Sequence, residues 1–116
     1  MKITLIIASL VTSFIVASTA QAAGLDYYKE GAICDKKAGF CADFMGVSVG
    51  LTKMYLGDKA EKKLMAEINK VGLEDFDATT FTMSGGLTCE TKKNTCWTSR
   101  NRDKVDSKAT KTLFGK

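Results

Sequence analysis

The alternation of apolar and polar positions predicts a β-hairpin shortly after residue 30. Residues 31–34 and 40–43 are short apolar-rich segments, and they flank a turn-forming stretch at residues 36–39 that ends in glycine. Glycine at such a place permits the positive φ angle that tight hairpin turns need. The preceding residues, 23–30, carry one leucine and two tyrosines. We expect this lead-in to start an edge strand or to pack over the core.

The spacing of apolar residues changes to a helical period between residues 48 and 72. Ser48 has the side chain of an N-cap, and Gly57 is expected to end the helix that follows it. Asp58 is predicted to cap a second helix, which Gly72 ends. The two helices together predict a helix-turn-helix corner. The second helix carries an apolar stripe formed by Ala60, Leu64, Met65 and Ile68.

Strand-like segments return at residue 79 and predict a three-stranded meander. The expected strands are joined by two tight turns and lie at residues 79–83, 87–90 and 95–99. A last short helix is predicted to begin at a cap formed by Asp106 or Ser107 and to end at Gly115.

The first 22 residues have the features of a secretory signal peptide. A lysine at position 2 precedes an apolar run from Ile3 to Ala17, and small residues ending at Ala22 supply the cleavage signature. We expect cleavage after Ala22, a periplasmic or secreted location, and one small domain over residues 23–116. The apolar run is shorter than the ~20 residues of a spanning helix, so no transmembrane segment is expected in the mature chain.

All four cysteines lie in one short pattern that occurs twice. A glycine stands three residues before Cys34 and before Cys89, and Cys41 and Cys96 each follow after six intervening residues. Opposed residues of an antiparallel hairpin have Cα atoms about 4.5–5.5 Å apart, which overlaps the range of a disulfide. Pairing of Cys34 with Cys41 and of Cys89 with Cys96 is therefore favoured over the two other connectivities.

The predicted fold is a small α+β domain. Two disulfide-closed hairpin units build an antiparallel sheet, and the helix-turn-helix corner packs its apolar stripe on one face. Export to an oxidising compartment is consistent with two disulfides as the staples of a domain of this size.

Residues that usually carry enzyme chemistry are scarce. The chain has no histidine, which removes the commonest general base and a leading zinc ligand. The cysteine gaps match neither a redox motif nor a zinc site, so we expect no cofactor and no metal. Asp35 and Glu90 occupy matching places after the first cysteine of each unit, and a carboxylate-based hydrolase that uses both ranks third among our hypotheses. A turn or strand-pairing role is the alternative for these acids.

Positive charge gathers in the last quarter of the chain. Residues 23–91 contain eight lysines against eleven acids, whereas residues 92–116 contain eight Lys or Arg against two Asp. In an exported protein this region favours anionic envelope components such as lipopolysaccharide, phospholipid or a wall polymer, and a solubilising role is the alternative. Nucleic acid is not an expected partner, because the chain is predicted to be exported and its basic residues lie mostly outside the helical corner.

Trp97 is the first candidate for a binding residue. It stands beside Cys96 and close to Arg100 and Arg102, and Trp and Arg are both enriched at interface hot spots. A role in filling the core is the alternative for a single tryptophan. Lys92 and Lys93, at the tip of the second predicted hairpin, complete the candidate set.

With these residues in place, the mature chain resembles the Fels-1 prophage-protein-like, or YcgJ-like, family of small exported enterobacterial proteins. Two positions depart from the family pattern, since Gly85 stands where an asparagine is usual and Glu90 where an aspartate is usual, and both changes keep the turn and the charge. The resemblance implies export and an association with prophage or accessory genes, and it carries no established activity. It rests on Gly31, Cys34, Asp35, Phe40, Cys41, Ala42, Asp43, Gly46, Ser48, Leu51, Thr52, Tyr55, Leu56, Gly57, Ala60, Leu64, Phe81, Thr82, Gly86, Cys89, Cys96, Leu113, Phe114 and Gly115.

The leading functional hypothesis is a non-enzymatic periplasmic or secreted protein-binding module. An inhibitor of a wall-degrading enzyme or a host-interaction factor would be of this kind, with Trp97 and the hairpin tips as its contact points. The alternative is a basic binder of an anionic envelope component.

Overall fold

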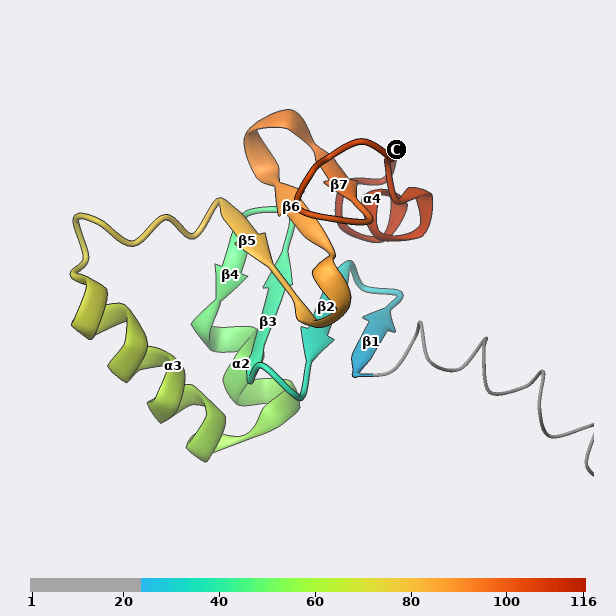
Figure 1. The fold of residues 1–116 in the computed structure, drawn as a ribbon. Coiled ribbons are helices and arrows are strands. Elements are labelled where there is room, and N and C mark those ends of the chain that lie inside the picture. Colours follow the sequence, from blue (N-terminus) through green and yellow to red (C-terminus); the bar gives the residue numbers. More distant parts are fainter. Residues whose placement is uncertain (1–23) are drawn as a thin grey trace, which may run out of the picture.

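The computed structural model describes residues 24–116, which form two antiparallel sheets and three α-helices (Figure 1). The predicted signal peptide lies outside the described residues. The α+β class and the two stapled hairpins predicted from the sequence are confirmed. The strands divide into two sheets, one for each hairpin.

The first sheet has four strands in chain order, each antiparallel to the next. They are β1 (Leu25–Tyr28), β2 (Ala32–Asp35), β3 (Phe40–Asp43) and β4 (Gly46–Ser48). The lead-in forms the edge strand β1, as expected, whereas β4 was not predicted because three residues give little strand pattern. Cys34 lies opposite Cys41 in the β2–β3 register, and their disulfide closes this hairpin.

The second sheet is the predicted three-stranded meander, with shorter strands than expected. Its strands are β5 (Thr80–Thr82), β6 (Thr88–Glu90) and β7 (Thr95–Trp97), joined by the 3-10 turns η1 (Ser84–Gly86) and η2 (Thr91–Lys93). Cys89 lies opposite Cys96 in the β6–β7 register, and the second disulfide joins them.

The three helices are α2 (Val49–Leu56), α3 (Asp58–Val71) and α4 (Ser107–Phe114). Ser48 caps α2 by accepting the N–H of Leu51, and Asp106 caps α4 by accepting the N–H of Ala109. The prediction that Asp58 caps α3 was wrong, because the single residue Gly57 both ends α2 and precedes α3. Asp58 lies instead in the first turn of α3, where its negative charge interacts favourably with the positive end of the helix dipole.

The hydrophobic core lies between the two sheets and is completed by α4. Ile33 and Ala42 face it from the first sheet, and Phe81, Cys89 and Cys96 face it from the second. Helix α2 covers the other face of the first sheet. In Figure 1, α3 lies beside the sheets, and its predicted apolar stripe is only partly covered, since its buried residue is Ile68 and Met65 is exposed.

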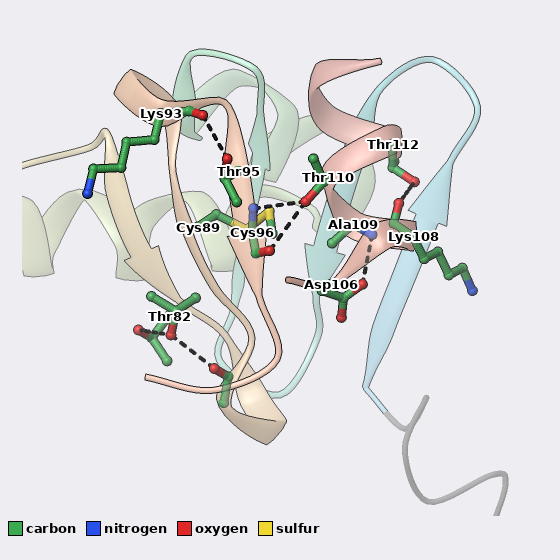
Figure 2. Close-up of a disulfide and its surroundings, with 12 residues drawn as sticks. Thr82, Cys89, Lys93, Thr95, Cys96, Asp106, Lys108, Ala109, Thr110 and Thr112 are labelled. Carbon is green, nitrogen blue, oxygen red and sulfur yellow. Dashed lines mark hydrogen bonds between the residues drawn. A yellow bond between two sulfur atoms is a disulfide. The ribbon is translucent and has the colours of Figure 1, made fainter. Parts of the chain in front are cut away.

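A buried threonine performs the same task in both halves of the chain. Thr52 Oγ1 accepts the backbone N–H of Cys41 at 2.9 Å and donates to the carbonyl oxygen of Ser48 at 2.7 Å. Thr110 Oγ1 accepts the N–H of Cys96 at 2.9 Å and donates to the carbonyl oxygen of the same residue at 3.3 Å (Figure 2). Each threonine lies four residues after the N-cap of its helix. The chain therefore repeats one unit, a stapled hairpin followed by a helix whose threonine binds the second cysteine.

The side chain of Asp35 connects the two halves. It is fully buried at the end of β2 and accepts three hydrogen bonds. Oδ1 accepts the N–H of Ala38 at 3.0 Å and the hydroxyl of Ser84 at 3.0 Å, and Oδ2 accepts the N–H of Ser84 at 2.6 Å. One carboxylate thus orders the first hairpin turn and anchors η1 of the other half.

We expect Thr52→Val and Thr110→Val each to lower the free energy of unfolding by about 1–3 kcal/mol, because each leaves the buried N–H of a cysteine without an acceptor. Valine keeps the volume of the side chain. Thr112→Val is the control, since the hydroxyl of Thr112 donates to the backbone carbonyl oxygen of Lys108 at the surface. Its free energy of unfolding should change by no more than about 0.5 kcal/mol. Urea unfolding of the oxidised protein measures all three. Equal losses for all three variants would contradict the assigned role.

We expect Asp35→Asn to lower the free energy of unfolding by about 3 kcal/mol, because the amide group turns a donor toward a backbone N–H and the charge-assisted bonds are lost. Ser84→Ala removes one of the three bonds and should cost about 1 kcal/mol. Asp43→Asn is the matched control, because Asp43 accepts only the surface N–H of Met45 among its described contacts. A loss for Asp35→Asn no larger than that for Asp43→Asn would show that Asp35 does not carry the connection.

Candidate functional site

Trp97 and Arg102 lie together on the outer face of the second sheet. Cys96 faces the core, so its neighbour Trp97 faces outward. The guanidinium carbon of Arg102 lies 5.0 Å from the centre of the Trp97 ring. Arg102 Nη1 also lies 3.0 Å from Glu90 Oε1, and Lys93 Nζ lies 3.7 Å from the same oxygen. Arg102 therefore links Trp97 to Glu90, and Glu90 also pairs with Lys93, so three of the predicted binding residues lie in one cluster.

The guanidinium of Arg102 makes its contacts within the protein, with Glu90 and Trp97. Arg102 has a positive φ of 58°, a conformation that costs a residue with a side chain roughly 1 kcal/mol. The ion pair with Glu90 and the contact with the Trp97 ring offset this cost, because both need the guanidinium at this place. Arg102 thus supports the indole of Trp97.

The other predicted basic residues do not join this cluster through any contact recorded in residues 24–116. Lys92 is exposed on η2, and Arg100 is exposed in the loop that follows β7. Figure 2 shows Lys93 and Lys108 pointing to opposite sides of the molecule. Lys108 Nζ lies 4.1 Å over the ring of Tyr27, whose pKa is raised by burial and then by the charge of Asp106. The basic residues of the last quarter are therefore spread over more than one face.

The structure does not bring Asp35 and Glu90 together. Asp35 binds Ser84, just beyond one end of β5, whereas Glu90 lies opposite Thr80 at the other end. Four residues of extended chain separate these points, roughly 13 Å along the strand. Each carboxylate is also bonded to groups of its own surroundings, so the geometry gives the paired-carboxylate hypothesis no support.

An apolar cleft that the sequence did not predict lies between β5, the first sheet and α3. Its volume is about 220 Å³. Phe40 and Phe81 meet edge to face at its base, with ring centres 6.1 Å apart. Side chains from β3, β4, β5, α3 and the connector after α3 line it, namely Phe40, Val47, Leu64, Phe76, Asp77, Thr80, Phe81 and Thr82.

The backbone of β5 is open on the side of this cleft. The N–H of Thr91 donates to the carbonyl oxygen of Thr79, and the N–H of Met83 donates to that of Leu87. Because hydrogen-bonded and non-hydrogen-bonded positions alternate in an antiparallel pair, the backbone groups of Thr80 and Thr82 point away from β6. They face outward along the edge that borders the cleft.

The first and second sheets touch at one end of this edge. The N–H of Val47 in β4 donates to the carbonyl oxygen of Ala78 at 2.9 Å, just before β5 begins. Gly46 makes this approach possible, because a Cβ atom there would lie 2.0 Å from the same oxygen. β4 and β5 are not paired beyond this bond, and residues of both strands line the cleft.

The β3–β4 turn beside this junction exposes two large apolar side chains. Phe44 and Met45 are 60% and 65% exposed. The carboxylate of Asp43 accepts the N–H of Met45, and Gly46 is held against Ala78, so both ends of the turn are fixed. The pattern Asp-x-x-Gly is typical of a tight turn, and two large apolar residues at its central positions were the available sequence signal for this surface.

The connector after α3 is acidic, and its Asp77 lines the cleft. Glu74, Asp75 and Asp77 are all exposed. The hydroxyl and the N–H of Thr79 both donate to Asp77 and lower the pKa of its carboxyl group. Asp77 therefore stays charged to a lower pH than an ordinary aspartate.

Residues 24–116 can be examined for metal-binding clusters and for helices that could span a membrane. No group of three His, Cys, Asp or Glu side chains in residues 24–116 is arranged to hold a metal ion. The helices found in this range lack the length and apolar character that a membrane span requires.

Comparisons with known proteins agree on one family. The family model described as YcgJ protein matches residues 25–114. The uncharacterized protein YcgJ of Escherichia coli (strain K12) is 31% identical over 105 residues, which cover 84% of this chain and 80% of the relative. No solved structure matches the chain. Because the family match includes both stapled hairpins and all three described helices, the chain belongs to the YcgJ family.

Proposed function

We propose that this protein is an exported, non-enzymatic binding module whose partner is another protein. Two disulfides support export, because such bonds persist in oxidising compartments and stabilise small secreted domains. The signal-peptide pattern of residues 1–22 supports the same location. Asp35 and Glu90 are occupied by contacts within the chain, which favours binding over a hydrolase built on these acids.

The observation that carries the proposal is the exposed pair Phe44 and Met45 on a fixed turn. Aromatic residues and methionine are enriched in protein interfaces, and both side chains here are mostly in contact with water. Because Asp43 and Gly46 fix the ends of the turn, a partner would bury these side chains without first having to order the backbone.

We expect the double change Phe44→Ser and Met45→Ser to weaken the affinity for a captured partner at least about tenfold, because two apolar contacts are lost. The melting temperature should stay close to that of the wild type, since both residues are exposed. Partners would be cross-linked to the oxidised mature protein in periplasmic extract, identified by mass spectrometry and titrated by calorimetry. Inhibition of lysozyme tests one partner class directly.

Met54→Ser is the matched control, because Met54 is 70% exposed on α2 and does not belong to the turn. It should leave partner affinity unchanged. The proposal fails if no protein partner is found at micromolar concentration, and the turn is excluded as the contact surface if the double variant binds as well as the wild type.

Binding to an anionic envelope component is the second candidate function. Exposed side chains with positive charge favour it, and they include Lys92, Lys93, Arg100, Lys104, Lys108 and Lys111. Because such side chains point to more than one face, as Lys93 and Lys108 do, we rank envelope binding below binding of a protein partner.

If the envelope surface is the partner, binding to lipopolysaccharide or anionic phospholipid vesicles should weaken strongly between about 50 mM and about 500 mM salt, because exposed charges are screened. Lys92→Gln with Lys93→Gln should reduce binding at low salt. Co-sedimentation with vesicles measures both effects, and neutral phosphatidylcholine vesicles are the control. Binding that is independent of salt would remove this candidate.

A further inference from the structure

We propose that the cleft between β5 and α3 receives an extended segment of the protein partner, which adds a strand to the free edge of β5 and inserts one apolar side chain. The inference rests on the proposed function and specifies the kind of segment that the partner supplies. An extended peptide bound in this way gains affinity from backbone hydrogen bonds and selectivity from a pocket for its side chain.

The edge of β5 has the backbone groups that such a segment needs. Thr80 and Thr82 direct their N–H and carbonyl groups away from β6 and toward the cleft. A single backbone hydrogen bond, from the N–H of Val47 to the carbonyl oxygen of Ala78, joins β4 to the chain just before β5, and β4 does not pair with β5 itself. An added strand would pair with the edge of β5 that β4 leaves open.

Two other outer strands, β1 and β7, are protected in ways that β5 is not. β1 carries Asp26, which pairs with Lys36 at 3.7 Å. The outer side of β7 is covered by the bridge between Trp97 and Val105. Natural edge strands avoid association by such charges and coverings, or by lysine and proline within the strand. β5 is Thr-Phe-Thr, so it has no charge, lysine or proline within the strand, and its short length is the one such device that it has.

The size and lining of the cleft suit one apolar side chain. Its volume of about 220 Å³ is below the ~300–1,000 Å³ of ordinary small-molecule pockets. Phe40 and Phe81 form an aromatic base, and Leu64 and Phe76 are the apolar side chains that α3 and the connector contribute. A leucine, methionine or phenylalanine of an added strand would replace water at these surfaces.

The negative charge of Asp77 favours basic residues in the partner segment beside the inserted side chain. Asp77 lines the cleft, and no lysine or arginine is among the lining residues, although Lys92 lies near enough to act on the charge of Asp77. Complementary charge steers encounter and discriminates against wrong partners. The segment that fits best is therefore extended, apolar at its centre and basic beside it.

The test uses synthetic peptides of nine residues with alternating threonine and valine, a central leucine and two flanking lysines. Fluorescence anisotropy with the oxidised mature protein measures affinity, and hydrogen exchange by NMR follows the amides of Thr80 and Thr82. We expect saturable binding, slower exchange of both amides, and at least about tenfold weaker binding when glutamates replace the lysines. A peptide with proline at every second position should not bind, because it cannot complete the ladder.

Two variants of the protein separate the edge from the pocket. Thr82→Pro removes an N–H that points away from β6 and so spares the backbone ladder, and Thr82→Val, which keeps this N–H and loses the same hydroxyl contact with Thr88, is its control. Leu64→Trp fills the cleft from α3 and leaves β5 unchanged. Each should weaken peptide binding at least about tenfold. Met65→Trp is the control, because Met65 is the next residue on α3 and does not line the cleft.

The inference is overturned if the peptides do not bind, or if Leu64→Trp and Thr82→Pro bind them as the wild type does. It is also overturned if the protein forms a dimer that Thr82→Pro dissociates, because the edge would then pair with a second copy of the chain. A captured partner that depends on Phe44 and Met45 but is unaffected by Leu64→Trp would leave the proposed function standing and remove this inference. The absence of any protein partner would remove the proposed function itself.

Discussion

The relative placement of the two sheets depends on the buried carboxylate of Asp35. A buried carboxylate is unfavourable unless its oxygens accept hydrogen bonds, and two of its three donors belong to Ser84 in the other half of the chain. Ser84 begins the turn that follows β5, and Ala78 at the other end of β5 is bonded to Val47. β5 is therefore fixed to the first sheet at both ends, while the edge between these anchors remains open.

The disulfides stabilise each half without joining the halves to each other. Each closes a short ring within one hairpin, worth roughly 2.5 kcal/mol by the loop-entropy estimate. Thr52 and Thr110 then attach the following helix to the second cysteine of each ring. The orientation of one half against the other depends on the shared core, on Asp35 and on the bond between Val47 and Ala78. A change at Asp35 would therefore alter the cleft although Asp35 does not line it.

Local features of the fold were predictable from the sequence, and long-range ones were not. The cysteine pairing follows from the even number of residues between the two cysteines of each hairpin and from the length of the loop. The N-cap at Ser48 follows from the type of its own side chain. The bond between Asp35 and Ser84 spans 49 residues, and no pattern near either residue indicates it. The cleft was missed for the same reason, because its walls come from five elements. Trp97 and Arg102 were correctly placed together because they are close in sequence.

The repeated unit explains where new function can arise in this fold. Both units contain a stapled hairpin and a threonine-bearing helix, and α3 with its connector stands between them. Leu64, Phe76 and Asp77 of the cleft all come from this intervening segment. Substitutions there alter the cleft without touching either staple, whereas substitutions at Thr52 or Thr110 disturb the framework. Separation of the framework from the proposed recognition surface would let one stable scaffold present different sites.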